Sequence, residues 1–417
     1  MSELKLSADT GGGTVSLKGP SATTSNADVA FVLPVADGSA NQVLKTDGSK
    51  NLGWVTSTDT DTDSLSFRNL LINGSCQVAQ RATSSSSHGY STVDRVKPYA
   101  TSHATSVTYS QSDVASGNDC YNAGFRKAFK VAISGAGNTS NSAAYIGHYK
   151  QRIEGQYIAQ SGWKYWDSDS KITLSFWIKS TTADTFQLQF YVDDNTKKKY
   201  NTPVTATTSW TKITKTVPGH SDINIDNDNN EGFAVQLVVA SGADLAGTVT
   251  QNTWVPNTTA AIAANNIDTW LTAGAGSVET TGWQLEVGDT ATTFEHIPYG
   301  DELLRCQRYY ESVYLSSYSV CGQAYATNHA IAPQWLRQEK RANPSITLPG
   351  VGSGTGEIAF MSSSAGWPSN HGSIGINDVT VQKFHYSGSG YTSSFTTGHA
   401  CLLHCNGTAV VKVDAEI

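Results

Sequence analysis

Hydrophobic and polar positions alternate along several short stretches in the middle of the chain. The clearest stretch is residues 172–178, in which every second side chain is apolar, and residues 186–192, 233–239 and 283–287 repeat the scheme. Successive side chains of a strand point to opposite faces, so this pattern predicts strands that each have one apolar face. Two sheets bury such faces by packing on each other, which predicts a β-sandwich with jelly-roll topology over residues 66–300.

The chain on either side of this region has a different pattern. Residues 1–65 contain only short apolar pieces, the longest being Val29–Val35, between runs of small and polar residues. Such a segment cannot close a core alone, so it is either a flexible linker or intertwined with other copies of the chain. Residues 301–312 have helical spacings and predict a short helix, after which the short strands up to residue 417 predict a smaller, distal β-sandwich domain.

Composition agrees with an all-β protein and excludes some functions. The chain has 417 residues, 37 Gly and only 11 Pro and 2 Met, and it is long enough for two or three domains. A net charge of -7 leaves no basic surface for a phosphate backbone, so we expect no nucleic-acid partner. No stretch of 18 apolar residues occurs, and Met1–Ser7 has no apolar core of a signal peptide. We therefore expect synthesis in the cytoplasm and no membrane insertion.

Several longer motifs occur in the order in which they are found in bacteriophage tail fibres, and the chain resembles that family over nearly its whole length. The motifs of the jelly-roll modules are Asn69–Arg81, Val93–Arg95, Gln151–Gly155, Leu174–Lys179, and Gly282–Glu295 with its continuation Glu302–Glu311. Three N-terminal pieces resemble the repeat of fibre shafts: Leu33–Gly38, Gln42–Gly48 and Leu52–Val55. The last residues, Val413–Ile417, resemble the C-terminus of a fibre.

This resemblance implies a homotrimeric structural protein of the virion. It implies that residues 1–65 attach to other tail, baseplate or capsid proteins, and that the fibre adsorbs to host cell-surface glycans without catalysis. In that family the jelly roll is similar to carbohydrate-binding modules. The shaft-like segment is short, which also fits a compact fibre near a baseplate or a capsid decoration. Two alternatives remain open: a purely structural capsid decoration or collar protein, and a monomeric sugar-binding module.

Glycan binding requires flat aromatic faces that stack on sugar rings and planar amides or carboxylates that bind adjacent hydroxyls. The outward faces of the predicted strands supply both kinds of side chain. If the strands at 172–178 and 186–192 lie in one sheet, they form a single patch, with further residues available from other strands. The alternatives are a subunit interface and ordinary solvated surface. The residues concerned are Trp177, Gln187, Gln189, Tyr191, Gln236, Gln284 and Glu286.

Aromatic residues in polar loops provide further candidates for glycan contacts. Trp163, Tyr165 and Trp166 crowd into one loop, where they either bind a ligand or plug the open end of the sandwich. In the terminal domain, aromatic residues lie in or beside Gly- and Ser-rich loops, where recognition is often located. Those candidates are Trp367, Tyr386 and Tyr391, with Trp335 nearby.

Metal binding and catalysis have weaker support. Cys401 and Cys405 lie about 13 Å apart on one face of an extended strand at about 3.3 Å per residue, so we expect buried free thiols rather than a zinc site or a disulfide. The acidic run Asp222–Glu231 departs from the EF-hand pattern, and the sequence leaves calcium binding there open. Carboxylates are scattered and no nucleophile elbow or metalloprotease motif occurs, so we expect no enzyme and no cofactor.

Overall fold

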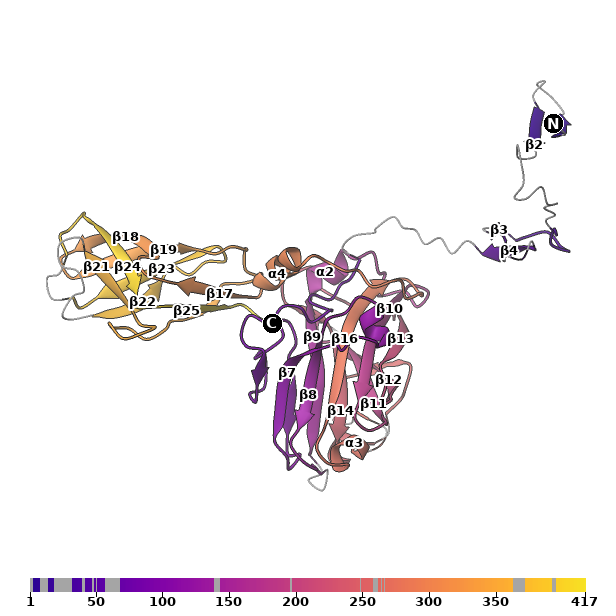
Figure 1. The fold of residues 1–417 in the computed structure, drawn as a ribbon, viewed down its shortest axis with the longest axis horizontal. Helices are drawn as coiled ribbons and strands as arrows, with labels where there is room; N and C mark the ends of the chain where they lie inside the picture. Colours follow the sequence, from indigo (N-terminus) through magenta and orange to yellow (C-terminus); the bar gives the residue numbers. More distant parts are fainter. Residues whose placement is uncertain are drawn as a thin grey trace. The chain divides into compact units, whose positions relative to one another are not determined.

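The computed structural model describes residues 3–7, 14–18, 32–39, 42–46, 49, 51–56, 68–138, 143–195, 197–247, 249–257, 262–263, 265, 267–362, 372–391 and 395–417. The chain divides into two compact units, Met1–Leu65 and Ser66–Ile417. Strands make up most of the regular structure (Figure 1), which confirms the predicted all-β class. Within the described residues, every helix is too short or too polar to cross a bilayer.

The described residues of the first unit form two antiparallel hairpins. They are β1 (Glu3–Ser7) with β2 (Thr14–Lys18), and β3 (Gln42–Thr46) with β4 (Leu52–Thr56). The indole nitrogen of Trp54 donates to the carbonyl oxygen of Ala36 at 2.9 Å. The Trp54 ring lies against Gly38, where a Cβ would come within 2.7 Å of it. This contact leaves several apolar side chains of the unit exposed to solvent: Val32, Leu33, Val35, Val43 and Leu44.

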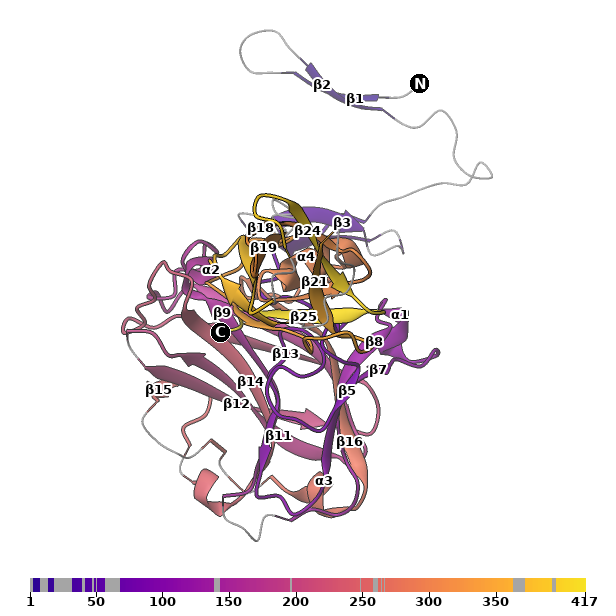
Figure 2. The same cartoon turned by 90° about the vertical axis from the view of Figure 1, so that its left-hand side faces the viewer.

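The second unit begins with two antiparallel six-stranded sheets packed face to face. Figure 2 shows them from the side, with β12 and β14 in one sheet and β7, β8 and β16 in the other. The first sheet has the order β13 (Thr211–Pro218), β10 (Lys171–Ser180), β16 (Gly276–Val287), β8 (Lys127–Ile133), β7 (Val107–Asp113), β5 (Ser84–Ser85). The second has the order β15 (Trp254–Pro256), β12 (Lys198–Ala206), β11 (Asp184–Val192), β14 (Glu231–Ser241), β9 (Tyr145–Glu154), β6 (Tyr99–Thr101).

Aromatic rings join the two sheets in the core of this sandwich. The ring of Trp283 on β16 lies between Phe176 of the same sheet and Tyr149 of the opposite sheet, with centroid distances of 3.9 Å to each and nearly parallel planes. All three side chains are buried. The apolar face predicted for residues 172–178 is therefore the face that enters the core, as period-two alternation requires.

Helices are short. Those described within the sandwich region are α1 (Asp119–Asn122), α2 (Gly155–Ala159) and α3 (Thr269–Thr272), together with the 3₁₀ turn Ala243–Leu245. The helix predicted at 301–312 is present as α4 (Tyr299–Gln307) but ends earlier. Its predicted last residues belong to β17 (Tyr310–Leu315), where Tyr310 pairs with Asp414. Pairing with a distant strand therefore outweighs the local helical spacing.

Two further sheets follow α4 and enclose a second core. The smaller has the order β17, β25 (Ala409–Asp414), β20 (Ser345–Thr347). The larger has the order β21 (Ile358–Ser362), β24 (Ala400–Cys405), β18 (Val320–Ala326), β19 (His329–Trp335), β23 (Lys383–Ser389), β22 (Ser373–Asn377). Side chains of both sheets form one cluster, in which Val411 of the smaller sheet is buried with Phe360 and Leu403 of the larger.

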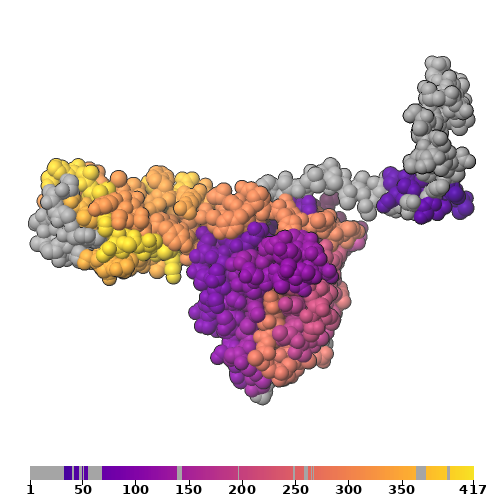
Figure 3. Space-filling model, viewed as in Figure 1, coloured from indigo at the N-terminus to yellow at the C-terminus, as the bar shows by residue number. Residues whose placement is uncertain are grey.

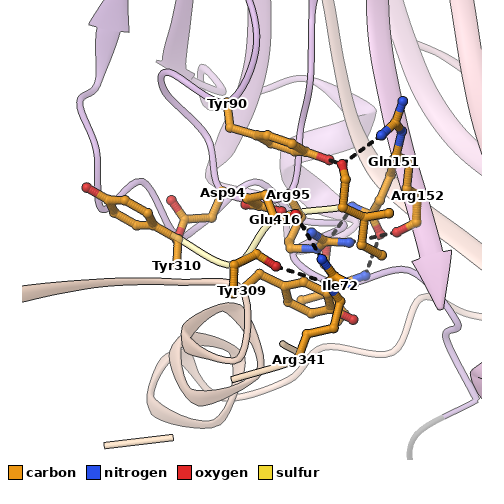
Figure 4. Close-up of polar contacts among 12 residues, drawn as sticks. Ile72, Tyr90, Asp94, Arg95, Gln151, Arg152, Tyr309, Tyr310, Arg341 and Glu416 are labelled. Carbon is orange, nitrogen blue, oxygen red and sulfur yellow. Dashed lines mark hydrogen bonds and ion pairs between the residues drawn. The ribbon is translucent and has the colours of Figure 1, made fainter. Parts of the chain in front are cut away.

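A buried polar network joins the sandwich to the strands that follow it (Figure 4). The guanidinium of Arg95 is wholly buried, lies 3.4 Å from the ring centre of Tyr309 and forms an ion pair with Glu416. Glu416 also pairs with Arg81 at 3.3 Å. Because loss of one partner would leave a buried charge unpaired, this network penalises separation of the two parts.

Candidate functional site

The outward faces that the sequence assigns to one patch lie on two different sheets. Trp177 is on β10 in the first sheet, whereas Gln187, Gln189 and Tyr191 are on β11 in the second. The predicted single patch is therefore wrong. Residues 181–183 carry the chain from one sheet to the other rather than turning it back as a hairpin. Alternation shows which side chains avoid the core, but not to which sheet they belong.

The outward face of the first sheet is covered by other parts of the chain. Trp177 is half-buried against a cluster that includes Trp210, Phe125 and Cys120. Figure 3 shows the covering segment around α1 as a purple bulge on this face. We call the outward face of β10 and β16 with this cover the closed face.

Gln284 and Glu286 on the closed face are also engaged within the protein. The Gln284 amide donates to Glu286 Oε1 at 3.1 Å. Glu286 accepts from the backbone N–H of Thr292 at 2.9 Å and from its hydroxyl at 2.6 Å. Both side chains are buried, so the structure makes them anchors of the loop after β16 and does not present them to a ligand.

The outward face of the second sheet carries a polar row across four strands. Asn201, Gln189, Gln236 and Lys150 are register neighbours on β12, β11, β14 and β9. The part of this row on β11 and β12 is closed, because Gln189 bonds to Asn201 at 2.8 Å and to the carbonyl oxygen of Ile262 at 3.3 Å. The predicted glycan contacts on β11 are therefore buried and hydrogen-bonded within the protein: Gln187, Gln189 and Tyr191.

The predicted aromatic loop separates into a plug and one exposed ring. Trp163 belongs to the sandwich core and donates from its indole nitrogen to the carbonyl oxygen of Ser170 at 3.3 Å, which supports the plugging alternative for this residue. Tyr165 is half-buried and donates to the carbonyl oxygen of Ile225 at 3.2 Å. Trp166 is 54% exposed and borders an open cavity of about 490 Å³ with His220, so its role as a ligand contact stays a prediction.

The aromatic candidates of the terminal sheets have different surroundings from those expected. Tyr386 and Tyr391 are buried in the second core, and the Tyr391 hydroxyl accepts from the Phe360 N–H at 3.1 Å. They therefore support packing and do not face solvent as predicted. Trp367 lies outside the described residues. Trp335 is exposed on β19, beneath the ammonium group of Lys383.

The cysteines on β24 are both buried and free, as the strand geometry predicts. In the acidic run, Asp222 pairs with Lys198 at 2.7 Å and Asp226 accepts from the Asn195 amide at 2.8 Å. Within the described residues, three or more potential ligands do not come together at any one point that could hold a metal ion. Calcium binding by this run therefore gains no support from its side chains.

A surface cleft remains open at the other end of the polar row, on β6, β9 and β14. We call it the Tyr99 cleft. Its volume is about 390 Å³, and it is lined by His88, Gly89, Lys97, Pro98, Tyr99, Tyr145, Gly147, Lys150, Arg152 and Gln236. Tyr99 is 51% exposed, so an aromatic face is available at the rim. Of the predicted glycan contacts, Gln236 alone lines this cleft.

The aromatic wall of the Tyr99 cleft is built by close contacts between side chains. The ring centre of Tyr99 lies 5.0 Å from that of His88 and 6.0 Å from that of Tyr145. The Tyr145 hydroxyl accepts a hydrogen bond from the Gln236 amide. A Cβ on Gly147 would come within 2.8 Å of the Tyr145 hydroxyl, so glycine leaves the space that this ring occupies. The cleft is therefore preformed, with aromatic and amide groups held in place.

An irregularity in strand pairing brings these residues to one face. Between β9 and β14 the register shifts after the pair Leu237–Tyr149, so that Val238 pairs with Gly147 and His148 is the extra residue on β9. Tyr145 and Lys150 then share a face although their spacing is odd. Strict alternation separates them, which is why sequence reasoning missed the site. The signal in the sequence that could have pointed to this site is the set of basic residues His88, Lys97, Lys150 and Arg152.

The charge of the Tyr99 cleft is positive. Glu231 forms ion pairs with Arg152 Nε at 2.9 Å and with Lys150 Nζ at 3.8 Å. Burial raises the pKa of Glu231, against the effect of both cations. Burial, followed by repulsion from Arg152 and Lys150, lowers the pKa of Lys97. Three basic side chains, Lys97, Lys150 and Arg152, thus line the cleft, and Glu231 pairs with two of them.

A larger cavity of about 450 Å³ lies beside α2 and α4, but its chemistry is less suited to a ligand. Its cations already have partners: Arg308 donates twice to Glu154, at 2.8 and 2.7 Å, and Arg305 donates to the carbonyl oxygen of Asn69 at 3.3 Å. Tyr157 is the one aromatic residue in its lining. The Tyr99 cleft, which has two tyrosines, an amide and excess charge, is the stronger candidate.

No protein-family model matches the chain, and no curated protein is similar to it in sequence. Among solved structures, it is similar to the enzymatically active domain of a bacteriophage CBA120 tailspike protein, with 11% identity, 53% of this chain and 22% of that chain covered, and a TM-score of 0.28. It is also similar to a family 11 carbohydrate-binding module of a Clostridium thermocellum cellulase, with 12% identity, 50% and 96% covered, and a TM-score of 0.25. TM-scores this low leave the function to be argued from the residues.

Proposed function

We propose that the chain is a structural fibre protein of a virion that adheres to host cell-surface glycans through the Tyr99 cleft, without catalysis. One observation carries the glycan-binding part: an exposed tyrosine, a second tyrosine and a glutamine amide line one preformed surface cleft. Aromatic faces stack on the C–H surfaces of sugars, and amides bind their hydroxyls. Sugar sites of this kind need little rearrangement on binding, which lowers the entropic cost of association.

The lining of the cleft supports binding rather than hydrolysis. Glycosidases require a pair of carboxyl groups that flank the scissile bond. None of the ten residues that line the Tyr99 cleft carries a carboxylate, and the neighbouring Glu231 is held by Lys150 and Arg152. A sugar bound there therefore does not meet the pair of carboxyl groups that most glycosidases use.

The fibre part of the proposal rests on the N-terminal unit and on the resemblance of the motifs to those of tail fibres. Val43, Leu44 and Leu33 expose apolar surface that a small unit cannot bury by itself. Association of three chains would cover these side chains in a shared core. In this proposal the first 65 residues also dock on another tail, baseplate or capsid protein, and the mature protein is located in the virion.

Glycan binding is tested with Tyr99→Ala in the full-length protein on a glycan array. We expect at least a tenfold loss of affinity, a factor that corresponds to about 1.4 kcal/mol. Tyr314→Ala is the matched control, because Tyr314 is an exposed tyrosine on β17, outside the cleft. Equal binding by wild type and Tyr99→Ala would reject the cleft as the glycan site.

The fibre architecture is tested by the solution mass from light scattering. Three copies of the 44.4 kDa chain would give about 133 kDa. Leu44→Asp should reduce this mass, because it places a charge on the surface that association would bury. A wild-type mass of 44.4 kDa would contradict the trimer and favour a sugar-binding module that acts as a monomer.

A further inference from the structure

We propose that the Tyr99 cleft selects acidic sugars, those that carry a carboxylate or a sulfate group. This inference rests on the proposed glycan-binding function and names its ligand class. Its basis is the juxtaposition of Lys97, Lys150 and Arg152 with the aromatic wall of one cleft that has no carboxylate in its lining. A neutral sugar would use the tyrosines and the amide but would leave the excess charge without a partner.

Two of the three cations have partners within the protein. Lys150 and Arg152 share Glu231, and Arg152 also donates to the carbonyl oxygen of Ile417 at 2.8 Å. Among the described residues, no carboxylate lies within ion-pairing distance of Lys97, whose ammonium group is 5.2 Å from the ring centre of Tyr90. Glu416, the next acidic neighbour, already pairs with Arg95 and Arg81. An anionic group on the ligand would complete the local charge balance.

The electrostatic surroundings of Lys97 support the binding of an anion. Burial and repulsion from Arg152 and Lys150 lower the pKa of Lys97. Three basic side chains thus lie together in this cleft, although the whole chain carries a net charge of -7. Partial burial also weakens the screening of these charges by salt, so a bound anion would interact strongly with them.

The position of the cations allows an anion and a sugar ring to be bound together. The backbone N–H of Lys97 donates to the carbonyl oxygen of Lys150 at 2.9 Å, which fixes the two basic residues beside each other on the cleft wall. Lys150 is also the register partner of Gln236, whose amide holds the Tyr145 hydroxyl. A sugar ring stacked on the tyrosines would thus have its substituents close to the ammonium groups.

The experiment is a glycan array in which each uronic-acid, sialylated or sulfated glycan stands beside its neutral counterpart. The full-length wild type is compared with Lys97→Gln, which is one atom shorter, keeps a polar end and removes the charge. The control is Lys212→Gln, because Lys212 is an exposed lysine on β13 of the other sheet. Thermal unfolding of each variant checks that the fold is retained.

We expect at least tenfold tighter binding of acidic than neutral members of a pair. Lys97→Gln should reduce that ratio at least threefold, and Lys212→Gln should leave it unchanged. Preference for uronic acids and sialylated glycans alone would assign a carboxylate, and preference for sulfated glycans alone would assign a sulfate. Equal binding of acidic and neutral glycans, lost in Tyr99→Ala, would overturn the charge inference but leave the glycan function standing. No binding to any glycan would overturn both.

Discussion

The two outward faces of the sandwich carry similar kinds of polar and aromatic residues, but other parts of the chain cover one face, and the other has an open cleft. On the closed face, Trp177 lies against Trp210, and Gln284 and Glu286 form hydrogen bonds within the protein. On the other face, the Tyr99 cleft keeps an exposed tyrosine and an excess of positive charge. Polar and aromatic residues in outward positions therefore do not distinguish a binding surface from one that the chain covers itself.

What separates the two faces is the path of the connecting segments. The segment around α1 covers β10 and β16, and the segment that includes Gln251 and Ile262 covers β11 and β12. Among the described residues, neither segment contributes to the lining of the Tyr99 cleft at the end of the second sheet, beside β6. Variants on the closed face should therefore change stability, whereas variants in the cleft should change affinity.

The largest effect is expected for Trp210→Ala on the closed face. Removing this buried ring should lower the free energy of unfolding by about 3 kcal/mol, because it leaves a cavity beside Phe125 and Trp177. Denaturant titration measures the change. Tyr99→Ala is the comparison and should cost less than about 1 kcal/mol, since its ring is half-exposed. Equal costs for the two variants would remove the distinction between the faces.

The next effect concerns the anchor of the loop after β16. Glu286→Ala should lower the free energy of unfolding by about 2 kcal/mol, because it removes the acceptor of both Thr292 hydrogen bonds. Glu339→Ala is the control, as this exposed carboxylate has one long hydrogen bond, from Gln382 at 3.3 Å. Glycan affinity should stay unchanged in both variants, and a loss of affinity in Glu286→Ala would return the closed face to the list of candidate sites.

A smaller effect is expected within the cleft for Gln236→Leu. The variant removes the amide that donates to the Tyr145 hydroxyl. Without this bond the Tyr145 ring must be ordered when the sugar binds. If ordering costs as much as a neutral hydrogen bond contributes, about 0.5–1.5 kcal/mol, glycan affinity should fall by about two- to tenfold. Isothermal titration calorimetry with a glycan found on the array measures this change. Gln187→Leu, on the covered part of the same sheet, should leave the affinity as it is.

The smallest effect is a pH dependence of the charge contribution. A lysine is charged below its pKa and neutral above it, and burial with repulsion from Arg152 and Lys150 lowers the pKa of Lys97. Wild type should therefore lose its affinity advantage over Lys97→Gln for an acidic glycan as pH rises. This loss should occur at a lower pH than for a lysine with an ordinary pKa. Affinity measured from pH 7 to 10 tests this, and a constant difference over that range would contradict it.

Much of the local structure could be predicted from the sequence. Period-two alternation identifies the strand at 172–178 and assigns Leu174 and Phe176 to the core, because the pleat of a strand is a local property. The start of α4 and the burial of Cys401 and Cys405 follow in the same way. The proposed glycan site could be predicted only in its kinds of residue, aromatic and amide, and in one member, Gln236.

The remaining features depend on contacts between residues far apart in the chain. Tertiary packing decides which sheet contains β11 and whether Gln284 contacts Thr292 or solvent. It also decides where the extra residue His148 shifts the register of β9. The sequence by itself thus determined the all-β class and the inward face of each strand, since side-chain direction follows from backbone geometry. Only the tertiary structure decided which outward face stays open, because burial of an outward side chain requires a covering segment from elsewhere in the chain.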